Sequence, residues 1–178
     1  VSESSAQALH GYGFQRDIVV MPNGISLTSP NEQDREQAIR IFHLPKNNVL
    51  LYCGQMNWKK NILRILQACA LLKRDERLFT LVLAGQGPDT QSIIDAAETL
   101  GLKGNIVLTG HITDEKLLYG LYQAATLFVF PSIYDTCGLV VREAAAMGTP
   151  AVVVEGSGAA EQIIDRENGF ICLDNDLS

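Results

Sequence analysis

Two carboxylates flank a predicted helix start in the stretch from Asp135 to Glu143. Asp135 precedes the helix, and Glu143 lies inside it. A helix start offers unpaired backbone N–H groups and the positive end of a dipole, so it suits an anion. Carboxylates accept hydrogen bonds from hydroxyl groups. Together these groups match the phosphates and hydroxyls of a nucleotide-sugar diphosphate, although both carboxylates could instead be solvated charges.

The elements around this stretch are clearly marked. The run Leu139–Met147 contains no Gly or Pro and holds three consecutive alanines, and Gly148 and Pro150 follow it as a helix stop. Upstream, the apolar run Thr126–Phe130 favours a strand. The order strand, loop, helix places a ligand at the carboxyl end of a parallel strand.

Short apolar runs alternate with helical stretches along most of the chain. Predicted strands cover residues 49–53, 79–84, 106–109, 127–130, 151–154 and 169–172. Predicted helices cover residues 62–72, 90–100, 114–125 and 139–147, with a short helix at 159–164. This alternation predicts an α/β fold with a doubly wound, parallel, six-stranded Rossmann-like sheet. The continuous apolar strands are typical of a sheet that is buried on both faces.

The first residues differ from the rest and form a lead-in to the domain. A short helix is expected over residues 2–9, and a strand that runs into a turn over residues 18–24. We therefore separate a lead-in over residues 1–17 from the ligand-binding domain over residues 18–178. The first residue is Val1 and not Met, so we expect a fragment or a processed product.

Composition excludes several classes of protein. The 178 residues are 47% hydrophobic and 19% charged, as in an ordinary globular domain. The net charge of −6 argues against a nucleic-acid partner. No apolar run approaches the roughly 20 residues of a membrane span. The four cysteines form no Cys-x-x-Cys pair, which favours thiols in a reducing cytoplasm.

Other ligand motifs are missing. A Gly-x-Gly-x-x-Gly fingerprint does not follow the first strand, and the half-match at residues 85–90 is broken by Pro88. The Walker A pattern is absent, and the three histidines lack metal-ligand spacing. We therefore expect no metal and no cofactor. Glycines nevertheless follow the predicted strands at Gly54, Gly85 and Gly110, which favours a ligand cleft over simple turns.

The order of the motifs resembles one family. From Ser2 to Leu173 the chain is similar to the C-terminal, donor-binding half of retaining GT-B glycosyltransferases of family 4. The matching segments are residues 21–25, 54–60, 83–88, 108–111, 130–132, 138–150, 158–161 and 168–169. Each segment is weakly specific, but their order and spacing together are highly specific.

The resemblance implies roles for individual residues. Lys60 matches the lysine that holds the donor pyrophosphate, Glu143 the glutamate that binds the ribose, and Asp135 the first glutamate, which contacts the transferred sugar. Lys60 has no obvious anionic partner in the sequence. The remaining substrate-binding candidates are Gly54, Gln55, Gly85, Gly87, Gly110, His111, Cys137, Gly138, Leu139 and Val140. Among these, Gly110 and His111 correspond to the base site, and residues 137–140 to backbone amides that hold the sugar and phosphates.

The implied activity is transfer of a hexose, with retention, from a nucleotide diphosphate sugar to an acceptor hydroxyl. UDP-sugar is the expected donor. The lead-in then corresponds to the end of an N-terminal acceptor domain that the fragment lacks, as it also lacks closing helices after residue 178. The fragment alone should be inactive, and any membrane contact would be made by the missing domain.

Two departures from the family pattern bear on the activity. Gln55 replaces a usual arginine, and Asp135 is one methylene shorter than the usual glutamate. They leave two alternatives open, a non-hydrolysing nucleotide-sugar 2-epimerase and a catalytically inactive nucleotide-sugar-binding module.

Overall fold

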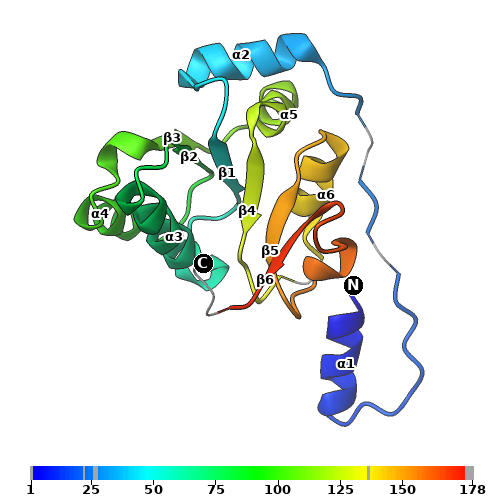
Figure 1. Ribbon diagram of the computed structural model, residues 1–178. Helices are drawn as coiled ribbons and strands as arrows, with labels where there is room; N and C mark the ends of the chain where they lie inside the picture. Colours follow the sequence, from blue (N-terminus) through cyan, green and yellow to red (C-terminus); the bar gives the residue numbers. More distant parts are fainter. Residues whose placement is uncertain (1, 22, 26–27, 136, 175–178) are drawn as a thin grey trace.

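A single six-stranded sheet forms the centre of the molecule (Figure 1). The computed structural model describes residues 2–21, 23–25, 28–135 and 137–174. The strands are β1 (Val49–Cys53), β2 (Thr80–Ala84), β3 (Ile106–Gly110), β4 (Leu127–Phe130), β5 (Ala151–Val154) and β6 (Gly169–Cys172). All five strand pairs are parallel, and the order is β3-β2-β1-β4-β5-β6. The predicted doubly wound parallel sheet is therefore confirmed.

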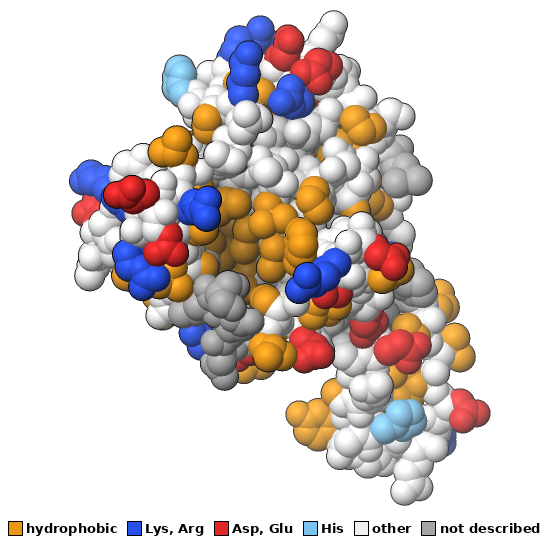
Figure 2. Space-filling model, viewed as in Figure 1, with side chains coloured by type: hydrophobic (Ala, Val, Ile, Leu, Met, Phe, Trp, Pro, Cys, Tyr) orange, Lys and Arg blue, Asp and Glu red, His pale blue; other side chains and the backbone are white. Residues whose placement is uncertain are grey.

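Helices connect the strands and cover the sheet. They are α1 (Glu3–Gly11), α2 (Glu32–Phe42), α3 (Ile62–Arg74), α4 (Thr90–Thr99), α5 (Glu115–Ala124) and α6 (Leu139–Ala146). Short 3₁₀ turns are η1 (Trp58–Lys60), η2 (Lys103–Asn105) and η3 (Ala160–Gln162). Because strand crossovers are right-handed, α3 and α4 lie on one face of the sheet, and α5 and α6 on the other. On the face seen in Figure 2, hydrophobic side chains gather in a hollow beside α3.

The core lies between the sheet and these helices. Aromatic rings fill its centre, where Tyr122 meets Phe128 edge to face at 5.5 Å between centroids and Phe128 stacks with Phe130 at 5.9 Å. Tyr52, on the neighbouring strand, stacks with Phe130 at 6.3 Å. All four aromatic side chains are almost completely buried. This cluster fixes the ends of β1 and β4 beside each other.

The strand order reverses between β1 and β4. The chain leaves β1 toward β2 and β3 on one side, and leaves β4 toward β5 and β6 on the other. Diverging connections leave a crevice at the carboxyl ends of these two strands, which is where sheets of this kind bind ligands. The loops that follow β1 and β4 therefore border the position where we expect the candidate site.

Two expectations about local structure were wrong, and one helix was missed. Residues 18–21 and 23–24 form no strand, because no neighbouring strand pairs with them; Val19 is 80% and Met21 71% exposed. The helix expected at 159–164 is only the 3₁₀ turn η3. Helix α2 was not predicted, although Asn31 caps its start by accepting from Gln33 N, and acidic residues fill its first turn.

Helix α1 lies at the edge of the molecule (Figure 1). Its first N–H groups donate to Glu161, from Glu3 N to Oε2 at 3.0 Å and from Ser4 N to Oε1 at 2.8 Å. Ser2 and Ala6 are buried at this contact end of the helix. In the described part of the chain, no helix is long and apolar enough to cross a membrane.

Candidate functional site

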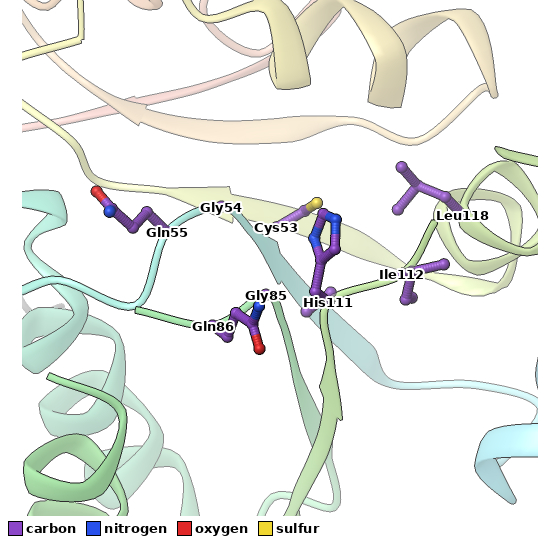
Figure 3. A pocket seen from close by; sticks show the side chains of 9 residues that line it. Cys53, Gly54, Gln55, Gly85, Gln86, His111, Ile112 and Leu118 are labelled. Carbon is purple, nitrogen blue, oxygen red and sulfur yellow. The ribbon is translucent and has the colours of Figure 1, made fainter. Parts of the chain in front are cut away.

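A pocket opens at the carboxyl ends of β1, β2 and β3 (Figure 3). Its volume is about 370 Å³, and its walls combine apolar and polar side chains. The lining residues are Cys53, Gly54, Gln55, Ala84, Gly85, Gln86, His111, Ile112 and Leu118. We call it the strand-end pocket. Four predicted site residues, Gly54, Gln55, Gly85 and His111, are thus brought together.

The pocket has a polar side and an apolar side. In Figure 3 the imidazole of His111 extends toward Cys53, while Ile112 and Leu118 lie together on the other side. The main-chain oxygen of Gln55 accepts a hydrogen bond from the buried Tyr52 hydroxyl at 2.9 Å. Sequence reasoning missed Cys53, Ala84, Gln86, Ile112 and Leu118 as lining residues. Cys53 is the last residue of β1, Gln86 follows the predicted Gly85, and Ile112 follows the predicted His111. Their position at the ends of strands was the signal that could have identified these three residues.

Two glycines allow the loops at the pocket to approach closely. A Cβ at Gly85 would lie 1.9 Å from the carbonyl oxygen of Gly54, and one at Gly87 would lie 2.4 Å from that of Met56. Any larger residue would push the β2 loop away from the β1 loop. Gly87 therefore holds the loop against Met56 and does not line the pocket. Gly110, at the end of β3, likewise lies outside the lining, and its oxygen accepts from Gly85 N at 2.8 Å.

An ion pair spans the reversal of strand order. Lys60, in the turn after β1, places Nζ 2.8 Å from Oδ2 of Asp135, in the loop after β4. The side chains are 27% and 20% exposed, so the pair is partly shielded from water but can still be reached by a ligand. Lys60 Nζ also lies 5.9 Å from the centre of the Phe130 ring. The expectation that Lys60 has no anionic partner was therefore wrong, because residues 75 positions apart meet only after the sheet forms.

Asp135 also holds the turn that leads into α6. Its Oδ1 accepts from Gly138 N at 2.8 Å and from Cys137 N at 3.3 Å. Burial alone would raise the pKa of Asp135, but the hydrogen bond from Lys60 and those from the two backbone N–H groups outweigh it and lower the pKa below the usual 3.8. Two of the predicted backbone donors, Cys137 N and Gly138 N, thus already hold an anion, the protein's own carboxylate.

Gly138 gives the helix start its shape. It has φ +55°, in the left-handed region, and a Cβ there would lie 2.8 Å from the Cβ of Ala159. Leu139 and Val140 then begin α6, and the first N–H groups of a helix have no acceptor within it. On the far side, Cys137 O accepts from Gln162 Nε2 at 2.8 Å. Cys137 and Gln162 line a second pocket of about 280 Å³ that also contacts Ser2 and Glu161.

Glu143, one turn into α6, is tied to the strand-end pocket through two other residues. The buried Tyr122 hydroxyl donates to Glu143 Oε2 at 2.9 Å. Cys53, which lines the pocket, is influenced by both Tyr122 and Glu143. Burial raises the pKa of the Cys53 thiol, hydrogen bonding with Tyr122 lowers it, and the charge of Glu143 raises it again. Glu143 is therefore close to the pocket and is not a freely solvated carboxylate.

Most of the predicted residues thus form two neighbouring groups at one edge of the sheet. The strand-end pocket holds one group, and the Lys60–Asp135 pair with the start of α6 holds the other. Tyr52 lies between them, since its hydroxyl contacts Gln55 and the charge of Asp135 contributes to raising its pKa after burial and Cys53. Among the described residues, no three His, Cys, Asp or Glu side chains are placed to hold a metal ion. The arrangement offers a recess for a partly apolar group beside an anion site.

Comparison with known proteins identifies the family. The model of the family "Glycosyl transferases group 1" matches residues 34–177. The chain therefore belongs to the group 1 glycosyltransferases. The match begins within α2 and includes the whole sheet, the strand-end pocket and the Lys60–Asp135 pair.

Curated relatives carry out different transfers. The chain is 33% identical over 129 residues to a glycogen synthase of Mycobacterium tuberculosis, covering 72% of this chain and 31% of that protein. It is 34% identical over 141 residues to an O-antigen chain mannosyltransferase B of Escherichia coli, covering 78% and 36%. A GDP-mannose-dependent alpha-(1-6)-phosphatidylinositol dimannoside mannosyltransferase of M. tuberculosis is 32% identical over 160 residues, with 89% and 40% covered. The chain thus spans well under half the length of these relatives.

Solved structures share the fold. HepE of Anabaena in complex with UDP and glucose superposes with a TM-score of 0.84 at 20% identity, over 99% of this chain and 49% of that one. The C-terminal domain of a group 1 glycosyl transferase, LpcC, of Francisella tularensis superposes with a TM-score of 0.72 at 23% identity, over 86% of this chain and 82% of that domain. The architecture is therefore that of the Rossmann-like half of GT-B glycosyltransferases.

Proposed function

We propose that this chain is the donor-binding domain of a retaining glycosyltransferase of family 4, and that the whole protein transfers a hexose from a nucleotide diphosphate sugar to an acceptor hydroxyl. The observation that carries the proposal is the meeting of Lys60, Asp135 and the start of α6 beside the strand-end pocket. A nucleotide diphosphate carries a flat base at one end and two phosphates beyond the ribose. The base can therefore lie in the pocket while the phosphates lie at Lys60 and the start of α6.

The two groups of residues fit different parts of the donor. The strand-end pocket, with His111 and Gln86 beside apolar walls, accommodates the base. Glu143 accepts hydrogen bonds from the ribose hydroxyls, and Asp135 contacts the transferred sugar. The complex of HepE with UDP supports a uridine nucleotide, whereas a GDP-mannose-dependent relative supports guanosine. We infer a UDP-sugar as the first donor to test and a GDP-sugar as the second.

The chemistry follows from charge. The bond between the sugar's anomeric carbon and the phosphate oxygen breaks, and its electron pair passes to the leaving diphosphate. Negative charge therefore grows at the phosphates, and fixed positive groups there stabilise the transition state more than the bound substrate. Lys60 and the N–H groups at the start of α6 are the groups of this chain that can do so. Neither requires a metal to act.

Binding must rearrange the ion pair. Lys60 and the N–H groups of Cys137 and Gly138 already hold Asp135. A diphosphate that takes these donors replaces one anion by another, so the gain in binding is smaller than for an unpaired lysine. The exchange frees the Asp135 carboxylate to accept hydrogen bonds from the sugar.

Calorimetry on residues 1–178 tests the proposal. We expect binding of UDP or GDP, and we expect Glu143→Gln to weaken the ribonucleotide more than its 2′-deoxy counterpart. Glu36→Gln, an exposed change on α2, is the control and should alter neither. Failure of the unmodified chain to bind any nucleoside diphosphate or nucleotide sugar would refute the proposal. Product analysis on the whole protein then separates transfer from 2-epimerisation and from binding without turnover.

A further inference from the structure

Tyr122 is a buried residue that no part of the donor needs to touch, yet it holds a residue of the site. We propose that Tyr122 is a positioning residue that fixes the Glu143 carboxylate for the ribose hydroxyls of the donor. The inference rests on the proposed function, because it assigns a ribose to Glu143. It adds that a residue outside the pocket lining, Tyr122, contributes to the preference for ribose over deoxyribose.

The Tyr122 side chain is held in one place. It is completely buried and packs edge to face on Phe128, with 5.5 Å between centroids and 64° between the rings. Its main-chain oxygen accepts from the buried Thr149 hydroxyl at 2.6 Å. A phenol held by packing and by its backbone cannot follow a moving carboxylate. Its hydroxyl is therefore a fixed point against which Glu143 is oriented.

The hydroxyl remains a donor under ordinary conditions. Burial raises the pKa of Tyr122, and the nearby Cys53 and Glu143 raise it further, so the phenol keeps its proton. The hydroxyl donates a hydrogen bond to Glu143 Oε2 at 2.9 Å. A neutral donor of this kind stabilises the ionised carboxylate without neutralising its charge.

One carboxylate oxygen is left for a ligand. Glu143 is half-buried, and its Oε1 accepts no hydrogen bond from the residues that the structure describes. A carboxylate with one oxygen anchored has few remaining orientations, so less freedom is lost when a diol binds. Cys53 lines the strand-end pocket, and both Tyr122 and Glu143 act on the pKa of its thiol, which places this arrangement next to the proposed base site.

The test compares ribose with deoxyribose. Tyr122→Phe removes the hydroxyl and keeps the ring, so the packing on Phe128 is retained. We expect affinity for the ribonucleoside diphosphate to fall about 3- to 10-fold, the range that loss of one hydrogen bond predicts, and affinity for the 2′-deoxy form to stay within about twofold. The probes are UDP and 2′-deoxy-UDP, or the guanosine pair if GDP binds more tightly. Tyr119→Phe, on the same helix, is the matched control.

A double-mutant cycle decides whether Tyr122 acts through Glu143. In a Glu143→Gln background, Tyr122→Phe should cause no further loss of ribose preference. Equal losses for the ribo and deoxy nucleotides, or a full ribose preference in Tyr122→Phe, would overturn this inference and leave the proposed function standing. If the unmodified chain binds no nucleoside diphosphate, the proposed function fails and this inference fails with it. Thermal unfolding of each variant identifies any loss that comes from misfolding.

Discussion

Lys60 Nζ and Asp135 Oδ2 lie 2.8 Å apart, although 75 positions separate the two residues in the chain. One follows β1 and the other follows β4, the two strands at which the order of the sheet reverses. The same carboxylate accepts from Gly138 N at 2.8 Å, in the turn that leads into α6. The positive groups that suit a phosphate are thus held together by an internal anion. Binding of a donor should therefore depend on how easily Asp135 gives up these contacts.

Replacing Lys60 should weaken the binding of phosphates selectively. We expect Lys60→Ala to lower affinity for UDP about tenfold or more, because a charge-assisted hydrogen bond contributes about 1.5–3 kcal/mol. Affinity for uridine should change little. Lys59→Ala is the control, since Lys59 lies in the same turn with an exposed side chain. Equal losses for UDP and uridine, measured by calorimetry, would show that Lys60 acts only on the shape of the loop.

Asp135 should make stability depend on acidity. Because its pKa is lowered in the folded protein, its ionised form stabilises the fold above pH 3.8, and this stabilisation is lost as the pH falls through the lowered value. Asp135→Asn should reduce the free energy of unfolding by about 1–3 kcal/mol at pH 7, and the deficit should shrink below pH 3.8. Urea unfolding across this range measures both quantities. Asp95→Asn, an exposed change on α4, should show no such narrowing.

Gly138 should tolerate no side chain. A left-handed φ of +55° and a Cβ position 2.8 Å from the Cβ of Ala159 both oppose alanine. We expect Gly138→Ala to lower the free energy of unfolding by about 1–3 kcal/mol, since strain in this backbone region and overpacking each contribute. Gly104→Ala is the matched control because open space surrounds that Cβ position. Denaturant unfolding that gave both variants the stability of the parent would contradict the tight contact between α6 and Ala159.

Helix α1 should depend on one carboxylate of the sheet domain. A helix of nine residues is marginal by itself, and Glu161 accepts from its first two N–H groups. Glu161→Ala should speed amide hydrogen exchange across Glu3–Gly11 at least severalfold, as expected when a helix cap is lost. Exchange in β1 and β4 should stay unchanged. Glu167→Ala provides the comparison, because Glu167 is exposed and its side chain caps no helix among the described residues. Unaltered exchange in α1 would show that other contacts hold the helix.

The sequence by itself determined the sheet. Apolar runs such as Val49–Cys53 and Leu127–Phe130 are too short and too continuous for exposed helices, and helix punctuation such as Gly148 and Pro150 separates them. A parallel order follows from the intervening helices. This reasoning also located Gly54, Gln55, Gly85 and His111 at strand ends, where the structure brings them into one pocket. It failed for residues 18–21 and 23–24, because a β-favouring composition forms a strand only when another strand pairs with it.

Only the tertiary structure decided which polar groups meet. Sequence spacing says nothing about partners far apart in the chain, so the Lys60–Asp135 pair, the Tyr122–Glu143 hydrogen bond and the cap that Glu161 gives to α1 were all unforeseen. Each joins segments that are separate in the chain and that the fold brings to the same place. Local patterns select helix or strand because they act over a few residues, whereas the partners of a charge depend on the order in which the strands assemble. That order places β1 beside β4, and with it Lys60 beside Asp135.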